Sequence, residues 1–185
     1  MTVLQTRRLL LRPWDEADLD EFVRLATDPR VVRHIGTGTV WDAERIRERH
    51  RGILDHWDQY GYGWRIAVDR ADGSVVGLEA LNRLGARVPG LDESYVEIGW
   101  WFAPRVWGRG LAGEGAVVVR DEAFTRLAAE CVVGRYQPAN EASGRIMDRL
   151  GMTDHGTYVD DAGITVAVKT MHREQWRAAT EGDAR

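Results

Sequence analysis

The first 61 residues change from the hydrophobic period of a strand to that of a helix. Apolar residues alternate with mostly charged ones from Arg8 to Pro13, which predicts a strand. Asp15 is then a candidate N-cap, with Asp18 at the capping-box position. The helix that follows ends at Asp28-Pro29, and its apolar face consists of Leu19, Phe22, Val23 and Ala26. A second predicted helix begins after Asp42, ends at Tyr60-Gly61 and has one side formed by Ile46, His50, Ile53, Leu54 and Trp57.

Strands and helices alternate in the remainder of the chain. The predicted elements are strands at Trp64–Asp69, Ser74–Leu81 and Tyr95–Ala103, a helix from Gly110 to Leu127, a strand at Cys131–Tyr136, a helix from Asn140 to Leu150, and a hairpin of Thr153–Val159 with Ile164–Met171. The longest predicted loop spans Gly85 to Ser94. The order β-α-α-β-β-β-α-β-α-β-β predicts one α/β (α+β) domain with a mixed sheet flanked by helices.

Composition narrows the classes of function. With 185 residues, 44% of them hydrophobic, the chain can bury the core of one domain. The formal charge of −4 disfavours binding to nucleic acid or to an anionic membrane, and no apolar run approaches the roughly 20 residues that cross a bilayer. Cys131 is the only cysteine, so neither an internal disulfide nor a cysteine-rich zinc site can form, and no metal is expected. The first eight residues lack a signal peptide's apolar core, so we expect a cytoplasmic protein.

A glycine-rich turn between a strand and a helix is the most informative segment. The strand that ends near Ala103 is followed by Arg105-Val106-Trp107-Gly108-Arg109-Gly110 and then by the predicted long helix. Helix N-termini present unpaired N–H groups and partial positive charge, and glycine allows a close approach of the backbone to a bound oxygen. The segment therefore predicts a phosphate-binding turn.

Three nucleotide-binding loops share this design. A Walker loop would need Lys and then Ser or Thr after its last glycine, and these residues are missing. The run from Gly108 to Gly113 matches the dinucleotide pattern G-x-G-x-x-G, which leaves an NADP-binding oxidoreductase, with Arg135 on a 2′-phosphate, as an alternative. However, residues 104–107 separate these glycines from the strand end, and further strands and two helices precede the motif. Residues 105–110 fit completely a pyrophosphate loop of the form Arg/Gln-x-x-Gly-x-Gly/Ala.

At this loop the chain resembles the GNAT N-acetyltransferases, and within them the RimJ/RimL-like branch. The motifs that carry the resemblance are, in chain order, residues 6–13, Glu97-Ile98-Gly99-Trp100, Trp107-Gly108-Arg109-Gly110, Asn140-Glu141-Ala142-Ser143 and Leu150-Gly151-Met152. They extend over nearly the whole chain. The resemblance implies a single GNAT domain over residues 1-185 with a mostly antiparallel sheet, and acetyl-CoA (coenzyme A) as the cofactor.

The resemblance also implies how the cofactor is held. Backbone N–H groups of Val106 and of Gly108 through Ala112 would bind the pyrophosphate. The strand end would pair with the pantetheine amides, which requires it to splay from the Cys131–Tyr136 strand. Arg105 and Arg109 would either reach phosphates or remain solvated. The expected cofactor residues are Trp100, Trp101, Phe102, Arg105, Val106, Trp107, Gly108, Arg109, Gly110, Leu111, Ala112, Asn140 and Ser143.

Acetyl transfer to an amine needs a group that removes the amine proton, because amines are largely protonated at neutral pH. Glu97 is the candidate base, although a strand glutamate can equally face solvent or pair with an arginine. Glu79 on the preceding strand and His34 are weaker candidates. Ser143 is the candidate donor to the departing thiolate, since the helix has no tyrosine near residues 145–147. Asn140 has two readings, a helix N-cap or a contact to the pantetheine arm.

The resemblance suggests the amine acceptor only in outline. The expected acceptor residues are His34, Trp41, Tyr62 and Glu79, together with acidic loop residues Asp92, Glu93, Asp160 and Asp161. Acidic and aromatic side chains suit a cationic amine, either a protein N-terminus or a small molecule. A catalytically silent acyl-CoA-binding regulatory module on the same fold is the second alternative. The eight tryptophans are compatible with a homodimer, but no interface is readable from the sequence.

Overall fold

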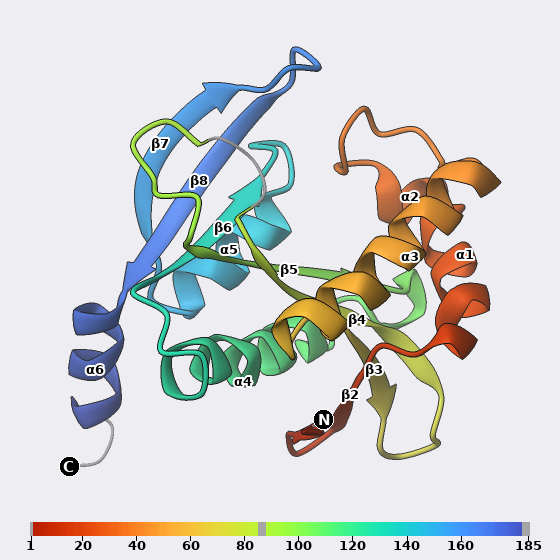
Figure 1. Ribbon diagram of the computed structural model, residues 1–185, viewed down its shortest axis with the longest axis horizontal. Coiled ribbons are helices and arrows are strands. Elements are labelled where there is room, and N and C mark those ends of the chain that lie inside the picture. The colour runs from red at the N-terminus through yellow and green to blue at the C-terminus, as the bar shows by residue number, and fades with distance from the viewer. Residues whose placement is uncertain (1, 85–87, 183–185) are drawn as a thin grey trace.

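Eight strands form a single mixed sheet in the order β1-β2-β3-β4-β5-β6-β8-β7 (Figure 1). The computed structural model describes residues 2–84 and 88–182. Within them, only the pair β5–β6 is parallel, and the other neighbouring strands are antiparallel. The strands are β1 Leu4–Gln5, β2 Leu9–Pro13, β3 Arg65–Asp69, β4 Val75–Arg83, β5 Val96–Phe102, β6 Cys131–Tyr136, β7 Thr153–Val159 and β8 Thr165–His172.

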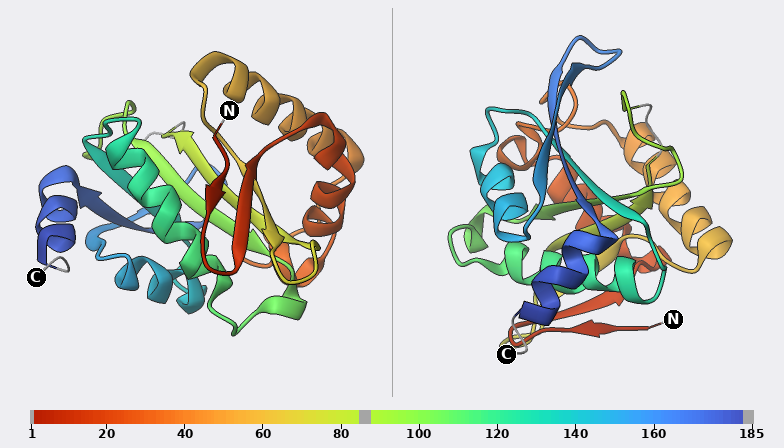
Figure 2. Two further views of the ribbon diagram at one scale, coloured as in Figure 1. Left: turned by 90° about the horizontal axis from the view of Figure 1, so that it is seen from below. Right: turned by 90° about the vertical axis from the view of Figure 1, so that its left-hand side faces the viewer.

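Helices cover both faces of this sheet (Figure 2). α1 and α3 pack on one face, and α4 and α5 pack on the other. The helices are α1 Leu19–Ala26, α2 Pro29–Val32, α3 Ala43–Tyr60, α4 Leu111–Thr125, α5 Glu141–Arg149 and α6 Arg173–Gly182, with short 3-10 turns η1 Glu16–Asp18 and η2 Pro104–Val106. Within the described ranges, no helix combines the length and apolar character needed to cross a membrane.

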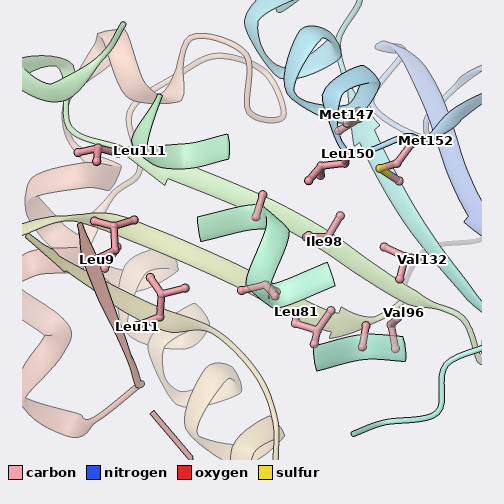
Figure 3. Packing of buried hydrophobic residues seen from close by; sticks show 14 of the residues in the cluster. Leu9, Leu11, Leu81, Val96, Ile98, Leu111, Val132, Met147, Leu150 and Met152 are labelled. Carbon is pink, nitrogen blue, oxygen red and sulfur yellow. The ribbon is translucent and has the colours of Figure 1, made fainter. Parts of the chain in front are cut away.

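The larger core lies between the sheet and α4 (Figure 3). Leu9, Leu11 and Leu81 from the strands are fully buried there, and Ile98 and Leu111 are 1% exposed. Burial of each such side chain stabilises the fold by about 1.5–3 kcal/mol. Because Ile98 lies on β5 and Leu111 opens α4, this core fixes both ends of the glycine-rich turn.

The predicted element order is confirmed, with a short additional helix, α2, between the first two predicted helices and two additions at the termini. β1 and α6 were not predicted, because β1 has only two residues and α6 depends on a tertiary contact: Trp176 stacks on Phe124 with ring centroids 5.3 Å apart. The Asp15–Asp18 capping box is present, but it opens a 3-10 turn before α1. Val23, predicted on the apolar face of this helix, is 37% exposed, so that assignment was wrong. In the predicted Gly85–Ser94 loop, residues 85–87 lie outside the described residues.

Candidate active site

The strand that leads into the glycine-rich turn separates from its neighbour at its midpoint. β5 pairs with β6 only from Val96 to Ile98, whereas its pairing with β4 continues to Phe102. In the described part of the chain, Gly99 to Phe102 therefore have a strand partner on one edge only. Such an edge offers N–H and C=O groups to an extended ligand. The splay expected from the sequence is present.

Two glycines in the left-handed region turn the chain from η2 into α4. Gly108 and Gly110 have φ angles of 75° and 74°. A Cβ added to Gly108 would meet no atom within 4 Å, so the backbone conformation, and not lack of space, requires glycine there. α4 begins at Leu111, directly after the second glycine.

The backbone N–H groups of this turn fall into two sets. Those of Val106, Trp107 and Arg109 donate to carbonyl groups of the turn itself. The other set donates to no protein acceptor within residues 2–84 and 88–182, and includes Gly108, Gly110, Leu111 and Ala112. Four free donors at a helix N-terminus fit a pyrophosphate. The expected donor roles of Val106 and Arg109 were wrong, because their N–H groups donate to the carbonyl groups of Ala103 and Val106.

The polar side chains around the turn mostly support its shape. The Trp107 indole N–H donates to the carbonyl of Phe102 at 2.7 Å, although the tryptophan is 52% exposed. The guanidinium of Arg105 donates to the carbonyl of Val75, and that of Arg109 lies 3.4 Å from the carboxylate of Asp69. Both arginines therefore have protein partners, and both remain beside the free N–H groups.

Arg8 also reaches this turn, which the sequence did not indicate. Its Nη1 donates to the carbonyl of Arg109 at 2.8 Å, and its Nε lies 2.6 Å from a carboxylate oxygen of Glu114 in the first turn of α4. Partial burial alone would raise the pKa of Glu114, but hydrogen bonds from Thr6 and Arg8 lower it overall. Arg8 thus compensates an acidic group that would otherwise repel a phosphate at this helix end.

A cavity of about 380 Å³ lies on the other side of the β5–β6 separation. It collects side chains from the segment between α2 and α3 and from α3, β4, β5, β6, α5 and the β7–β8 hairpin. Eight of the residues singled out from the sequence line it, namely His34, Trp41, Glu97, Trp100, Trp101, Asn140, Ser143 and Asp160. Their convergence from distant segments makes the cavity the candidate reaction site.

Five expected acceptor residues lie outside the cavity lining, and Glu79 is one of them. Tyr62 packs edge-on against His56 at 4.9 Å, and its side chain belongs to the core on the α4 face. Asp92 and Asp161 are exposed loop residues, and neither they nor Glu93 line the cavity. Charge and aromaticity alone did not identify the side chains that point inward.

Glu79 was assigned to the wrong face of the sheet. Its side chain is fully buried, and its carboxylate has no hydrogen-bond partner in the described part of the protein. It lies against α4, where a Cβ added to Gly115 would come within 2.4 Å of Oε1. Burial raises the pKa of Glu79 well above its usual range. We therefore treat Glu79 as a neutral core carboxyl group and not as an acceptor-binding residue.

Glu97 is held by a bidentate ion pair. Nε and Nη2 of Arg135 each lie 2.8 Å from a different oxygen of the Glu97 carboxylate, and Nη1 of Arg135 donates to the hydroxyl of Tyr158 at 3.1 Å. The pairing with an arginine, one of the two interpretations offered by the sequence, is thus observed, and Glu97 also lines the cavity. A carboxylate has further lone pairs beyond the two that Arg135 uses.

The start of α5 contributes an N-cap and a free hydroxyl. The Asn140 side chain accepts from the Ser143 N–H at 3.3 Å, so its structural role as N-cap is confirmed. Within the described residues, no hydrogen bond involves the Ser143 hydroxyl, which leaves it available to a ligand in the cavity. Tyr136 lies beside it, and its hydroxyl would be 3.3 Å from a Cβ added to Gly144.

Sequence reasoning missed four polar residues of the cavity. They come from α3, β4, the end of β6 and the residue after it, and are Arg49, Asn82, Tyr136 and Gln137. Arg49 could have been noticed, because it lies three residues after Ile46 beside the buried stripe of its helix. Nothing in the sequence marks the other three.

Comparisons with known proteins agree with this geometry. A family model described as an acetyltransferase (GNAT) domain matches residues 8–153. The uncharacterised N-acetyltransferase YnaD of Bacillus subtilis (strain 168) is 24% identical over 84% of this chain and 85% of its own length. The FsC-acetyl coenzyme A-N(2)-transacetylase of Aspergillus fumigatus is 28% identical over 84% of this chain and 66% of its own length. The crystal structure of an acetyltransferase from Agrobacterium tumefaciens str. C58 is 27% identical, covers 93% of this chain and 95% of its own, and has a TM-score of 0.78.

The fold rules out the dinucleotide-binding alternative. A Rossmann domain needs a mostly parallel sheet with its glycine loop after the first strand. Here the loop follows β5, and β5–β6 is the one parallel pair of the described sheet. With the family model matching most of its length, the chain belongs to the GNAT family of acetyltransferases and is an acetyl-CoA-dependent N-acetyltransferase.

Proposed function

We propose that the protein transfers the acetyl group of acetyl-CoA to a primary amine in the Glu97–Ser143 cavity by direct attack of the amine. The observation that carries the proposal is the continuity of three features: free N–H groups at the turn, an unpaired edge along Gly99–Phe102, and a cavity on the far side of that edge. Acetyl-CoA supplies the acetyl group as a thioester. A bond forms from the amine nitrogen to the acetyl carbon, the carbon–sulfur bond breaks, and the proton lost by the amine balances the one gained by the thiolate.

The four free N–H groups and the strand edge support this cofactor. The donors of Gly108, Gly110, Leu111 and Ala112 would hold the pyrophosphate, with Arg8, Arg105 and Arg109 around it. The edge at Trp100 and Trp101 would bind the pantetheine amides. A backbone N–H near Trp101 would polarise the acetyl carbonyl group.

Glu97 and Ser143 are the groups proposed to handle protons. Because Arg135 uses one lone pair on each Glu97 oxygen, Glu97 would accept the amine proton through a remaining lone pair or through a water molecule. The hydroxyl of Ser143 would hydrogen-bond the departing sulfur. Tyr136, which shares the cavity, is the other hydroxyl that could do so.

The proposal is tested by incubating the protein with acetyl-CoA and a panel of primary amines while thiol release is followed. The panel contains small amines and peptides with free N-termini, since the RimJ/RimL-like resemblance points to protein N-termini. Thiol release together with a product carrying one added acetyl group supports acetyl transfer. Binding of acetyl-CoA without thiol release from any amine would instead support the silent regulatory module. NADPH serves as the control ligand, and binding of NADPH alone would contradict the cofactor assignment.

A further inference from the structure

One cationic side chain in the cavity has no acidic partner. Arg49 projects from the middle of α3 and lines the cavity, and its guanidinium carbon lies 4.8 Å from the centre of the Trp64 ring. Within residues 2–84 and 88–182, no hydrogen bond or ion pair involves Arg49. Arginines on a protein surface commonly remain solvated in this way. The surroundings of Arg49 therefore decide whether it is a binding residue.

Arg49 is exposed as a whole residue, but its guanidinium end lies over the Trp64 ring at the wall of the cavity. Burial lowers the pKa of the Arg49 guanidinium below its usual value, and the positive charges of Arg135 and Arg45 add to this effect, while the charge of Glu97 opposes it. A cation that is partly removed from water and lies near other positive charges is less stable than a fully solvated one. It would gain free energy by pairing with an anion.

The acidic groups that face the cavity have partners other than Arg49. Both oxygens of Glu97 bind Arg135 at 2.8 Å. Asp160 uses Oδ1 to accept the N–H groups of Ala162 and Ile164 in the β7–β8 turn, at 3.0 and 2.9 Å. Neither carboxylate forms an ion pair with Arg49 in the described structure, so the guanidinium is available to an anion from outside the chain.

The walls near Arg49 suit an apolar body on the same molecule. Trp41, Trp64 and Trp101 line the cavity, and the Trp64 indole N–H donates to the Asn82 side chain at 2.8 Å. The glycine-rich turn at residues 105–112 does not contribute to this lining, so the phosphates of coenzyme A are expected elsewhere. The anion that reaches Arg49 would therefore belong to the acceptor.

We infer that the acceptor is a small amine that carries its own anionic group, and that Arg49 binds this group while the amine points to Glu97. This inference rests on the proposed acetyl transfer and names the substrate class for the same cavity. It reverses the expectation of a purely cationic amine drawn from acidic loop residues, because those residues are paired or lie outside the cavity. A carboxylate and a phosphate share the required chemistry.

Matched pairs of acceptors separate the contribution of the anionic group from that of the amine. Phenylalanine and 2-phenylethylamine differ only by a carboxylate, and phosphoethanolamine and ethanolamine differ only by a phosphate. For each compound, kcat/KM for thiol release is measured, and binding to the coenzyme-A-saturated protein is measured by calorimetry. We expect the anionic member of at least one pair to bind and to react at least tenfold better, and the better pair identifies the anion.

The variant Arg49→Gln should reduce that preference at least tenfold, mainly through KM. Arg45→Gln is the matched control, because Arg45 lies on the same helix, 4.0 Å from the centre of the Trp41 ring, and does not line the cavity. It should leave the preference unchanged.

The outcomes separate the two proposals. Plain amines that are acetylated as well as their anionic partners would overturn the inference and leave acetyl transfer intact. The inference also fails, with acetyl transfer unaffected, if Arg49→Gln and Arg45→Gln behave alike. If no compound reacts but the anionic members still bind through Arg49, the anion site stands and acetyl transfer to this class fails. Absence of both binding and reaction for the anionic compounds would also overturn the inference.

Discussion

The two ends of the site are built by different means. The cofactor turn lies in one continuous segment from Phe102 to Ala112, and its proposed contacts are backbone N–H groups. The acceptor cavity takes side chains from seven segments between His34 and Val166. A backbone site depends on local conformation, so it tolerates changes of side chain but not of φ. A cavity built from distant side chains depends on the whole fold, and a single substitution can change its selectivity.

The largest effect is expected from a charge placed in the turn. Gly110→Asp would put a carboxylate beside the pyrophosphate, at a cost of about 4 kcal/mol for charges 4 Å apart near a protein surface, or roughly a thousandfold in affinity. Gly73→Asp is the matched control, because Gly73 has a φ of 75° in an exposed hairpin turn and an added Cβ there meets nothing within 4 Å. Calorimetry with acetyl-CoA should show loss of binding for the first variant alone. Equal affinities would contradict the assignment of the turn.

The next effect separates chemistry from binding in the cavity. Glu97→Gln should lower kcat on the order of a hundredfold near pH 7, while the Kd for acetyl-CoA stays the same. The loss should shrink as the pH rises toward the pKa of the amine, because more of the acceptor is then already deprotonated. A pH–rate profile of both proteins provides the measurement. An unchanged rate near neutral pH would remove Glu97 from the mechanism.

A smaller effect should come from the support of the turn. Trp107→Phe removes the hydrogen bond to the carbonyl of Phe102, which contributes about 1 kcal/mol, so affinity for acetyl-CoA should fall roughly fivefold. Trp57→Phe is the control, since the Trp57 indole makes a similar 2.7 Å bond to the carbonyl of Trp64 in the other core. That variant should lower the melting temperature without changing affinity. If both variants bind acetyl-CoA equally weakly, the proposed difference between the two regions is contradicted.

The smallest effect on activity, but a distinct one on stability, is expected from Glu79. Its folded-state pKa is raised by burial, so between the usual carboxyl pKa and the raised one the folded protein binds more protons than the unfolded chain. The contribution to stability is therefore full at acid pH and falls as pH rises, by up to about 1.4 kcal/mol per pH unit. Glu79→Gln should flatten this fall in denaturant titrations at pH 5 and pH 8. The exposed Glu48→Gln serves as control, and identical profiles for the two variants would refute the neutral core carboxyl group.

The same comparison explains how far the sequence could predict the site. The turn was predictable because left-handed glycines and a helix start are local features, and Gly108 and Gly110 adopt them. Glu97 and Glu79 are both strand glutamates, yet one faces the cavity and the other faces α4, and this depends on strand register. Arg49 was missed because an arginine on a polar helix is normally solvated, and its place beside the buried stripe of α3 was the one local sign that it lines a cavity.

The central claim is that the turn and the cavity serve one reaction through the separation of β5 and β6. A crystal structure of the protein with acetyl-CoA tests it most directly. We predict the pyrophosphate on the N–H groups of Gly108, Gly110, Leu111 and Ala112, the pantetheine along Gly99–Phe102, and the thioester inside the cavity beside Glu97 and Ser143. A pantetheine arm that leaves the strand edge and places the thioester outside this cavity would contradict the account.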